Sequence, residues 1–298
     1  MHWRAVFLAL GLAVAPGVSC NLPTTPTADR ALWLWNSDII TSSTSVSTFL
    51  SVVKDRAISR VHAQINSDIS TTLWESFIKK CNNQGIAVEA LIGDKQWVLD
   101  RTTNGGPTLQ SELDWIKQFQ VNAPVEARFA GIHLDIEPWT LGETEWAANS
   151  ATYVESLTGL VDTVVSVTEP LNLTVAADLP FWANTVACGD GTLDTCLLGN
   201  LDSVTFMTYR NTAAELLRVT TPLLNAAAET ASGKPIWLAV EMCAEAADTP
   251  NTISYNGTSV ERVECDLAMV EKNATAYSGF AGFAFHSYAC LALLRATE

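Results

Sequence analysis

The stretch FAGIHLDIEPW, residues 129–139, ends an apolar run with two carboxylates, Asp135 and Glu137. Side chains at positions i and i+2 of a β-strand point to the same face. His133, Asp135 and Glu137 therefore share one face, and the opposite face carries the apolar residues Ile132, Leu134 and Ile136. The apolar face suits a covering layer of helices. The pattern predicts a strand whose inner face carries two acids at its open end.

Strand-like runs alternate with longer segments of helical spacing along the rest of the chain. The eight predicted strands are residues 31–37, 59–66, 86–94, 129–137, 173–180, 202–210, 235–241 and 280–288. Helix candidates lie between most of them, as at 43–57, 71–85, 109–119 and 212–232. Gly85 and Gly233 stand where helix-terminating glycines belong.

Strands that alternate with helices pair in parallel. Eight such units in about 270 residues match a closed barrel, whose typical size is ~250 residues. The sequence therefore predicts an α/β fold, a single-domain (β/α)₈ TIM barrel. A doubly wound open sheet is the alternative. That fold usually carries a glycine-rich phosphate turn after the first strand, and here the turn reads WNSDIITSS.

The amino-terminal region predicts secretion. In residues 1–20 a basic start, MHWR, precedes the apolar run AVFLALGLAVA and the short polar end PGVSC, as in a signal peptide. Residues 17–20 also resemble a bacterial lipobox without its usual leucine. No run reaches ~18 apolar residues, so we expect no membrane anchor. We expect an arm at 21–30, a catalytic barrel at 31–298, and an extracellular glycoprotein with sequons at Asn172, Asn256 and Asn273.

The charge and cysteine content of the sequence limit the partners and cofactors that we expect. The formal net charge is −15, without a basic stripe, and such a surface repels phosphate backbones. We therefore expect no nucleic-acid partner, and we predict a monomer without a cofactor. Six cysteines follow the leader, and their spacing lacks the pattern of a zinc site. Cys188 and Cys196 bracket a short loop, and the other pairs considered, among fifteen possible connectivities, are Cys243–Cys265 and Cys81–Cys290.

Polar or aromatic residues end every predicted strand. In a (β/α)₈ barrel the reactive residues gather at these carboxyl-terminal ends. The catalytic candidates are Asp135, Glu137, Tyr209 and Glu241. The candidate substrate-binding residues are Trp35, Asn66, Asp94, Trp139, Asp178, Trp182, Arg210 and His286. Apolar packing alone does not require this convergence, so it indicates a functional site.

The two neighbouring acids suggest the chemistry. Close carboxyls disfavour simultaneous ionisation, so one of them should keep a raised pKa and donate a proton near neutral pH. We predict that Glu137, nearest the rim, is this acid, and that Asp135, one layer deeper, orients its neighbour. The alternative is that both acids only tie down loops through hydrogen bonds.

Two short segments resemble a known family. GIHLDIE is similar to the fourth-strand signature of family 18 chitinases, DGxDxDxE, through Gly131, Asp135 and Glu137. FMTYR, residues 206–210, is similar to the sixth-strand MxYD of the same family. The residues that differ from these patterns are Ala130 and His133, in place of the first two aspartates, and Arg210, in place of the last.

This resemblance implies Glu137 as general acid, Asp135 as the residue that orients a substrate acetamido group, and Tyr209 as a donor to that group. A second resemblance, to retaining glycosidases with the 4/7 arrangement, rests on Glu137-Pro138 and on KPIWLAVE, which ends in Glu241. It implies Glu241 as a nucleophile whose carboxyl lies ~5–5.5 Å from that of the acid. The two schemes disagree about whether Asp135 or Glu241 does the second job.

Several other residues have two interpretations. Arg210 either recognises an anionic sugar or pairs with Asp178 or Glu241. Tryptophans at strand ends stack on sugar faces or belong to the core; these are Trp35, Trp139 and Trp182. We expect packing under helices for Trp74, Trp115 and Trp237. We expect hydrogen-bonded interior positions for His62 and His133.

Three functions are consistent with this pattern. The first is a secreted glycoside hydrolase acting on a polysaccharide or oligosaccharide, with Glu137 as acid. The second is a carbohydrate-binding, lectin-like barrel without catalysis. The third is a metal-assisted phosphodiesterase, since rim carboxylates bind Mg²⁺ or Ca²⁺; its site would comprise Asp94, Asp135, Glu137 and His286.

Overall fold

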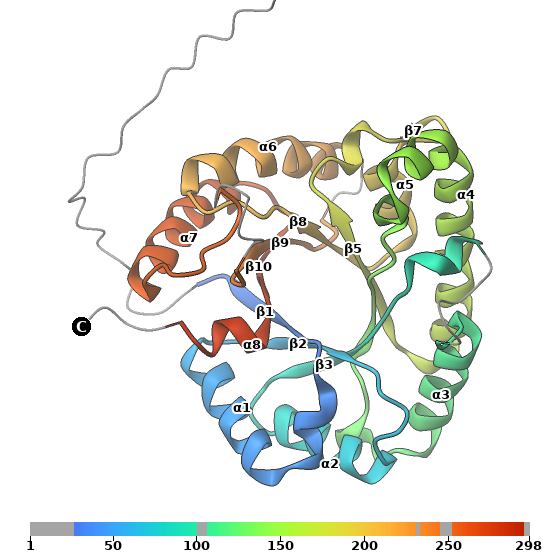
Figure 1. The fold of residues 1–298 in the computed structure, drawn as a ribbon, viewed down its shortest axis with the longest axis vertical. Coiled ribbons are helices and arrows are strands. Elements are labelled where there is room, and N and C mark those ends of the chain that lie inside the picture. Colours follow the sequence, from blue (N-terminus) through green and yellow to red (C-terminus); the bar gives the residue numbers. More distant parts are fainter. Residues whose placement is uncertain (1–26, 100–105, 231–232, 245–251, 295–298) are drawn as a thin grey trace, which may run out of the picture.

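The computed structural model describes residues 27–99, 106–230, 233–244 and 252–294. Within these ranges eight parallel strands close into a barrel, in the order β1-β2-β3-β4-β5-β8-β9-β10 around the ring (Figure 1). The strands are β1 Asp29–Leu34, β2 Arg60–Gln64, β3 Ala87–Ile92, β4 Gly131–Leu134, β5 Thr174–Pro180, β8 Ser203–Met207, β9 Ile236–Glu241 and β10 Phe280–His286. The predicted (β/α)₈ TIM barrel is confirmed.

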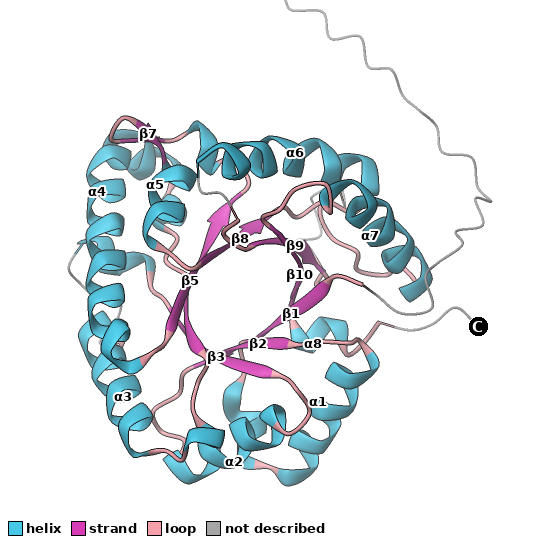
Figure 2. Ribbon diagram, turned by 180° about the vertical axis from the view of Figure 1, so that it is seen from behind, coloured by secondary structure: helices cyan, strands magenta, loops and turns pink. Residues whose placement is uncertain are grey.

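The helices form an outer ring around these strands (Figure 2). They are α1 Ser43–Asp55, α2 Thr71–Asn82, α3 Leu109–Asn122, α4 Glu143–Thr168, α5 Leu193–Asn200, α6 Ala213–Thr230, α7 Val260–Ala274 and α8 Tyr288–Leu291. Side-chain caps fix several starts, as where the Ser42 hydroxyl accepts from the Ser45 N–H. In the described ranges no helix combines the length and apolar character needed to cross a bilayer.

The alternation of side chains along the strands follows the predicted parity. Ile132 and Leu134 of β4 pack with the outer core, whereas His133 is fully buried inside the ring. On β10, Phe283 and Phe285 likewise face the helices.

The prediction for Trp237 is wrong. Trp237 lies inside the barrel, packed with Ala31, Trp33, Leu91, Ala239 and Ala284. Its strand neighbours are the apolar residues that take the helix-facing side, so parity turns the indole inward.

The disulfides confirm one prediction and correct two. Cys188 bonds to Cys196, within the crossover that also holds the hairpin β6 Ala187–Cys188 and β7 Gly191–Thr192. Cys243 bonds to Cys290 instead of Cys265. Cys81 is a buried free thiol on α2. Because β9 and β10 pair directly, the chain after β9 lies against the chain after β10, which brings Cys243 to Cys290.

Removal of the two bridges by paired serine substitutions should give unequal losses of stability. The Cys243–Cys290 loop spans 47 residues and the Cys188–Cys196 loop spans 8. The loop-entropy model gives about 4 kcal/mol for the longer loop and about 2.5 kcal/mol for the shorter one. Urea unfolding of the two double-serine variants measures the difference. Equal losses in the two variants would contradict the loop-length argument for this barrel.

Candidate active site

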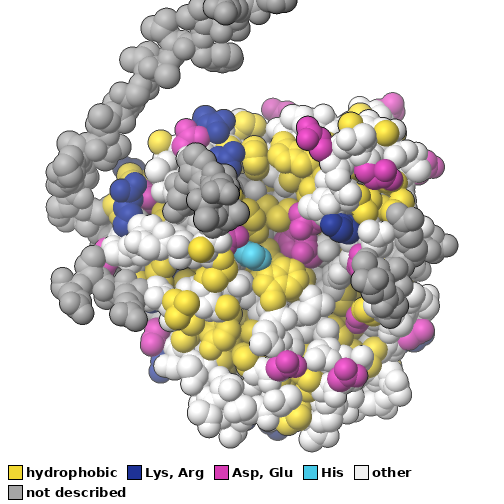
Figure 3. Space-filling view, viewed as in Figure 1, with side chains coloured by type: hydrophobic (Ala, Val, Ile, Leu, Met, Phe, Trp, Pro, Cys, Tyr) yellow, Lys and Arg dark blue, Asp and Glu magenta, His cyan; other side chains and the backbone are white. Residues whose placement is uncertain are grey.

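A cavity of about 180 Å³ opens at the carboxyl-terminal end of the barrel. Its lining residues are Trp33, Trp35, Asp135, Glu137, Asp178, Met207, Tyr209 and His286. The space-filling view shows acidic side chains and a histidine among hydrophobic ones at the centre of this face (Figure 3). Of the twelve predicted site residues, the fold gathers six around one cavity: Trp35, Asp135, Glu137, Asp178, Tyr209 and His286.

Asp135 follows β4 and is held there by the sheet. Its backbone N–H donates to the Ile92 carbonyl oxygen, 2.9 Å away, so β3 sets the height of the carboxyl. Burial raises the pKa of Asp135 well above its usual value, and the charges of Asp178 and Glu137 raise it further, against the opposing charge of His133. Burial and the neighbouring negative charges therefore both disfavour the ionised form of Asp135.

Glu137 lies nearer the rim, where the chain enters the 3₁₀ helix Pro138–Leu141. Burial raises the pKa of Glu137, and the charge of Asp178 adds to the effect. Trp139 opposes it, because its indole N–H donates to the Glu137 carboxyl at 2.9 Å. A half-buried carboxyl with a raised pKa, open to a cavity, has the properties of a general acid.

Asp178, at the end of β5, is buried and accepts two hydrogen bonds. His133 Nε2 lies 2.8 Å from one carboxyl oxygen, and the Trp33 indole N–H donates to the other at 3.1 Å. These two partners fix the carboxyl beside Asp135 and Glu137. The prediction that His62 and His133 are hydrogen-bonded interior residues is confirmed, since His62 Nδ1 also lies 2.9 Å from a carboxyl oxygen of Glu89.

The opposite wall of the cavity carries a second hydrogen-bonded chain. The Trp35 indole N–H lies 2.9 Å from His286 Nε2, and His286 Nδ1 lies 2.8 Å from a Glu241 oxygen. Because an indole N–H only donates, Nε2 accepts and Nδ1 carries the proton. The other Glu241 oxygen accepts from the Cys243 N–H at 2.7 Å. Glu241 therefore lies behind His286, outside the cavity lining, with both oxygens engaged.

Tyr209 completes the site from the loop after β8. Its ring lies 5.9 Å from that of His286, between centroids. Burial raises the pKa of Tyr209 well above its usual value, and the surrounding carboxylates raise it further. The hydroxyl therefore keeps its proton and is available as a hydrogen-bond donor to a bound group.

Five predicted binding residues lie outside the cavity lining, and three of them are held by other contacts. The Asn66 side chain accepts from the Asp68 N–H and donates to Asp38, in the loop after β1. Asp94 accepts from the Gln96 N–H in the loop after β3. The Arg210 guanidinium lies over the Phe181 ring at 4.6 Å, and within the described ranges it forms no ion pair with either of its two predicted partners, Asp178 and Glu241.

The predicted tryptophans Trp139 and Trp182 join a third, Trp146 of α4, in an edge-to-face cluster beside Glu137. The ring centroids lie between 5.7 and 6.3 Å apart. A second hollow of about 350 Å³ begins at this cluster; its lining residues include Trp146, Ser150, Trp182 and Thr185. Trp74 and Trp115 pack under the helices against Phe129, as predicted.

Sequence reasoning missed two residues of the cavity lining, Trp33 and Met207. Both were available from strand parity, since each stands two positions before a residue that was selected, Trp35 and Tyr209 respectively. Trp146 carried no such signal, because it lies on a helix that only the folded chain brings beside Trp182.

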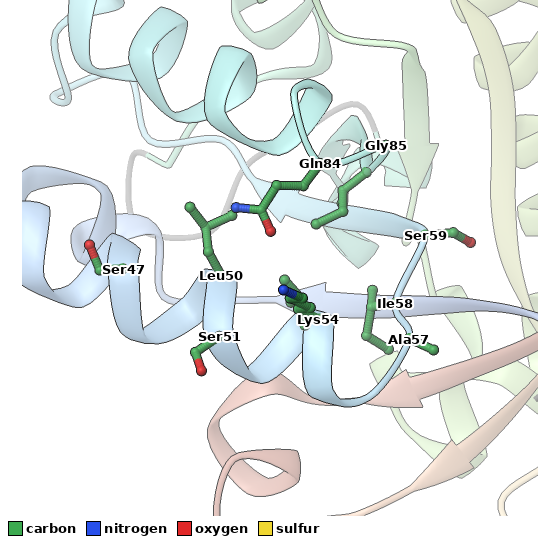
Figure 4. Close-up of a pocket in the computed structure, with 11 residues that line it drawn as sticks. Ser47, Leu50, Ser51, Lys54, Ala57, Ile58, Ser59, Gln84 and Gly85 are labelled. Atoms are coloured by element: carbon green, nitrogen blue, oxygen red, sulfur yellow. The ribbon is translucent and has the colours of Figure 1, made fainter. Parts of the chain in front are cut away.

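A larger hollow of about 730 Å³ lies elsewhere, between α1 and the turn after α2 (Figure 4). Leu50, Lys54 and Gln84 are among its lining residues, and Ser59 and Ile86 place it at the amino-terminal ends of β2 and β3. Neither a carboxylate nor a histidine lines it. In a (β/α)₈ barrel this end contributes to stability, and chemistry occurs at the other end. The smaller cavity is therefore the candidate active site.

The geometry does not bring together the four residues of the metal hypothesis. Within the described ranges two clusters contain three residues with closely spaced ligand atoms: His62 with Glu89 and His133, and Glu241 with Cys243 and His286. In the first, Glu89 is ion-paired with Arg60. In the second, Cys243 is disulfide-bonded. Neither cluster fits a divalent cation, and Asp94 is bound to its own loop.

Solved structures share this fold. A chitinase from Chromobacterium violaceum ATCC 12472 is 11% identical, with a TM-score of 0.53 over 88% of this chain and 95% of the other. A GH113 β-1,4-mannanase is 10% identical, with a TM-score of 0.53 over 88% and 87%. A xylanase-A-amylase inhibitor protein is 13% identical, with a TM-score of 0.51 over 88% and 94%.

These similarities show the fold alone. Enzymes of polysaccharide hydrolysis and an inhibitor protein share the barrel, so the side chains at its mouth must decide the function. No protein-family model matches the sequence, and no curated protein matches it either.

Proposed function

We propose that this protein is a glycoside hydrolase in which Glu137 is the general acid. One observation carries the proposal: a carboxyl with a raised pKa faces an open cavity beside Asp135, Asp178 and Tyr209. Protonation of a departing glycosidic oxygen requires such a group. The hydrolases among the structures of similar fold are compatible with this chemistry.

The geometry favours the first of the two catalytic schemes. Glu241 does not line the cavity but lies behind His286, so its carboxyl is not placed to attack an anomeric carbon bound there. Asp135 and Tyr209 both line the cavity, and Tyr209 keeps its proton and can donate a hydrogen bond. We propose that they hold an acetamido group of the substrate. Its carbonyl oxygen bonds to the anomeric carbon as the glycosidic bond breaks and Glu137 gives its proton to the leaving oxygen. Water then hydrolyses the intermediate and returns a proton to Glu137. Glu241 positions His286, and the substrate is a polymer of acetamido sugars.

The aromatic side chains at the mouth support a sugar ligand. Trp35 is 37% exposed, and the cluster of Trp139, Trp146 and Trp182 lies beside the acid. Half-exposed rings with a polar edge bind amphipathic surfaces such as sugar faces. We also propose that the protein is secreted after removal of residues 1–20. The exposed positions of Asn172, Asn256 and Asn273 are compatible with glycosylation.

The test is digestion of a polysaccharide panel that includes chitin, β-1,4-mannan and xylan, with reducing ends as the readout. We expect release of oligosaccharides from an acetamido-sugar polymer such as chitin. The rate should be the same with and without EDTA, because the scheme uses no metal. Binding to a polysaccharide without release of reducing ends would favour the lectin-like alternative. Loss of activity in EDTA would favour metal-assisted chemistry.

A further inference from the structure

A row of charged side chains crosses the barrel interior directly beneath the cavity. Arg60 pairs with Glu89 at the amino-terminal side. A single oxygen of Glu89 lies 2.9 Å from His62 Nδ1 and 3.4 Å from His133 Nδ1. His133 Nε2 lies 2.8 Å from Asp178, which lines the cavity. The row therefore joins a partly buried ion pair at one end of the barrel to the candidate active site at the other.

The surroundings of His133 favour its charged form. Nε2 is hydrogen-bonded to Asp178 at 2.8 Å, whereas Nδ1 lies 3.4 Å from a Glu89 oxygen and has no hydrogen-bond partner. The ring therefore lies between two carboxyl groups, an arrangement that stabilises an imidazolium. The His133 side chain is fully buried, and a buried cation persists only where opposite charges compensate it.

His62 and His133 cannot both be charged. Their rings stack with centroids 3.7 Å apart, a separation at which two imidazolium ions repel each other in a dry interior. His133 contacts two carboxylates and His62 contacts one, so the charge belongs on His133. Burial and the charge of His133 lower the pKa of His62 to about 4. Burial alone would lower the pKa of His133, but Asp178 and Glu89 together raise it to about 10.

We propose that His133 is a permanent imidazolium that positions Asp178 as a carboxylate under the Asp135–Glu137 pair. Asp178 then supplies, from the neighbouring strand β5, the negative charge beneath the acid pair. The catalytic part of this inference rests on the proposed function, whereas the protonation of His133 does not.

Asp178 acts on the acid pair through its charge. Its carboxyl is held by His133 and by the Trp33 N–H, and its negative charge raises the pKa of both Asp135 and Glu137.

The groups that face His133 are Glu89 from β3, His62 from β2, Asp178 from β5 and Asp135 from its own strand, with Arg60 behind Glu89. Among these, Asp178 alone both hydrogen-bonds His133 and lines the cavity.

The first experiment measures the proton directly. Ring ¹⁵N chemical shifts of the folded wild-type protein are followed from about pH 5 to 9, a range in which an ordinary histidine loses its charge. The sequence holds four histidines, so few signals need assignment. We expect both nitrogens of His133 to stay protonated throughout and His62 to stay neutral. A neutral His133 at pH 7 would overturn the proposal.

The second experiment measures the effect on the acid pair. Asp178→Asn removes the charge with little change of shape, so the alkaline limb of the kcat/KM profile should move to lower pH by about 1 unit. Asp194→Asn is the matched control: Asp194 is equally buried, but it bonds Thr192 at the start of α5, away from the cavity. Its profile should coincide with that of the wild type. If the alkaline limb of Asp178→Asn lay at the same pH as that of the wild type, Asp178 would not raise the pKa of the acid pair.

The protonation of His133 and the effect of Asp178 on the acid pair can each be tested even if the proposed function is wrong. If no polysaccharide is hydrolysed, carboxyl ¹³C shifts of Glu137 replace the rate profile, and its pKa should still be lower in Asp178→Asn than in the wild type. If Asp178→Asn does not fold, the wild-type ¹⁵N titration decides alone. If the contact between His133 and Asp178 were only structural, Asp178→Asn would change the stability of the protein but leave the pKa of Glu137 unchanged.

Discussion

Glu137→Gln should lower kcat/KM on a natural polysaccharide by about 100- to 10,000-fold, the range that a positioned general acid contributes. The amide keeps the size of the carboxyl and can still interact with the Trp139 N–H, but it has no proton to give. Binding should therefore be retained. Reducing-end release measures turnover, and affinity electrophoresis in a polysaccharide gel measures binding.

The leaving group gives a second readout of the same role. An aryl glycoside departs without protonation, so Glu137→Gln should lose much less activity on it than on the polysaccharide. A merely structural role would reduce both rates equally. Equal losses on the two substrates would therefore refute Glu137 as the proton donor.

Glu112→Gln is the matched control for this substitution. Glu112 is another largely buried glutamate, and burial raises its pKa to about 7, but it lies on α3 and not at the cavity. The control should have wild-type activity. Its stability should be equal or greater above pH 7, because the folded state of the wild type opposes ionisation of Glu112 and so loses stability between pH 4.5 and 7.

Gly93→Ala should strongly reduce activity although Gly93 does not line the cavity. A Cβ at Gly93 would lie 1.9 Å from the Asp135 carbonyl oxygen and 2.4 Å from its carbonyl carbon. Both atoms are backbone, so β3 and the segment after β4 must move apart. Asp135 and Glu137 move with that segment, and a displacement of about 1 Å at a catalytic group can cost about 100-fold in rate. We expect that loss, together with a lower Tm.

Gly159→Ala provides the control for this glycine. Gly159 lies in the interior of α4 with nothing within 4 Å of the added methyl group. Alanine should therefore stabilise the helix by about 0.5–1 kcal/mol and leave activity unchanged. Thermal unfolding and reducing-end assays on both variants make the comparison. Wild-type activity in Gly93→Ala would mean that the position of Asp135 is not needed for the chemistry.

The sequence could predict which face of a strand a side chain lies on and where each strand ends, because both depend only on residues close together in the chain. The period of two along residues 129–137 predicted the inward face of β4, and the alternation of strands and helices predicted a ring with its acids at one end. Six of the twelve predicted residues consequently meet at one cavity. Asn66 and Asp94 were chosen by the same rule but bond to loop residues outside the cavity lining, since a position after a strand does not specify where a side chain turns.

The sequence by itself determined the eight-unit barrel, the inward acids of β4 and the disulfide that closes the short loop at Cys188. The tertiary structure decided which side chains of paired strands meet. The pairing of β9 with β10 placed Glu241 behind His286 and joined Cys243 to Cys290. The pairing of β4 with β3 and β5 put His133 between Glu89 and Asp178. The physical reason is separation along the chain: contacts between residues dozens of positions apart depend on how the strands pair, and no local period records that.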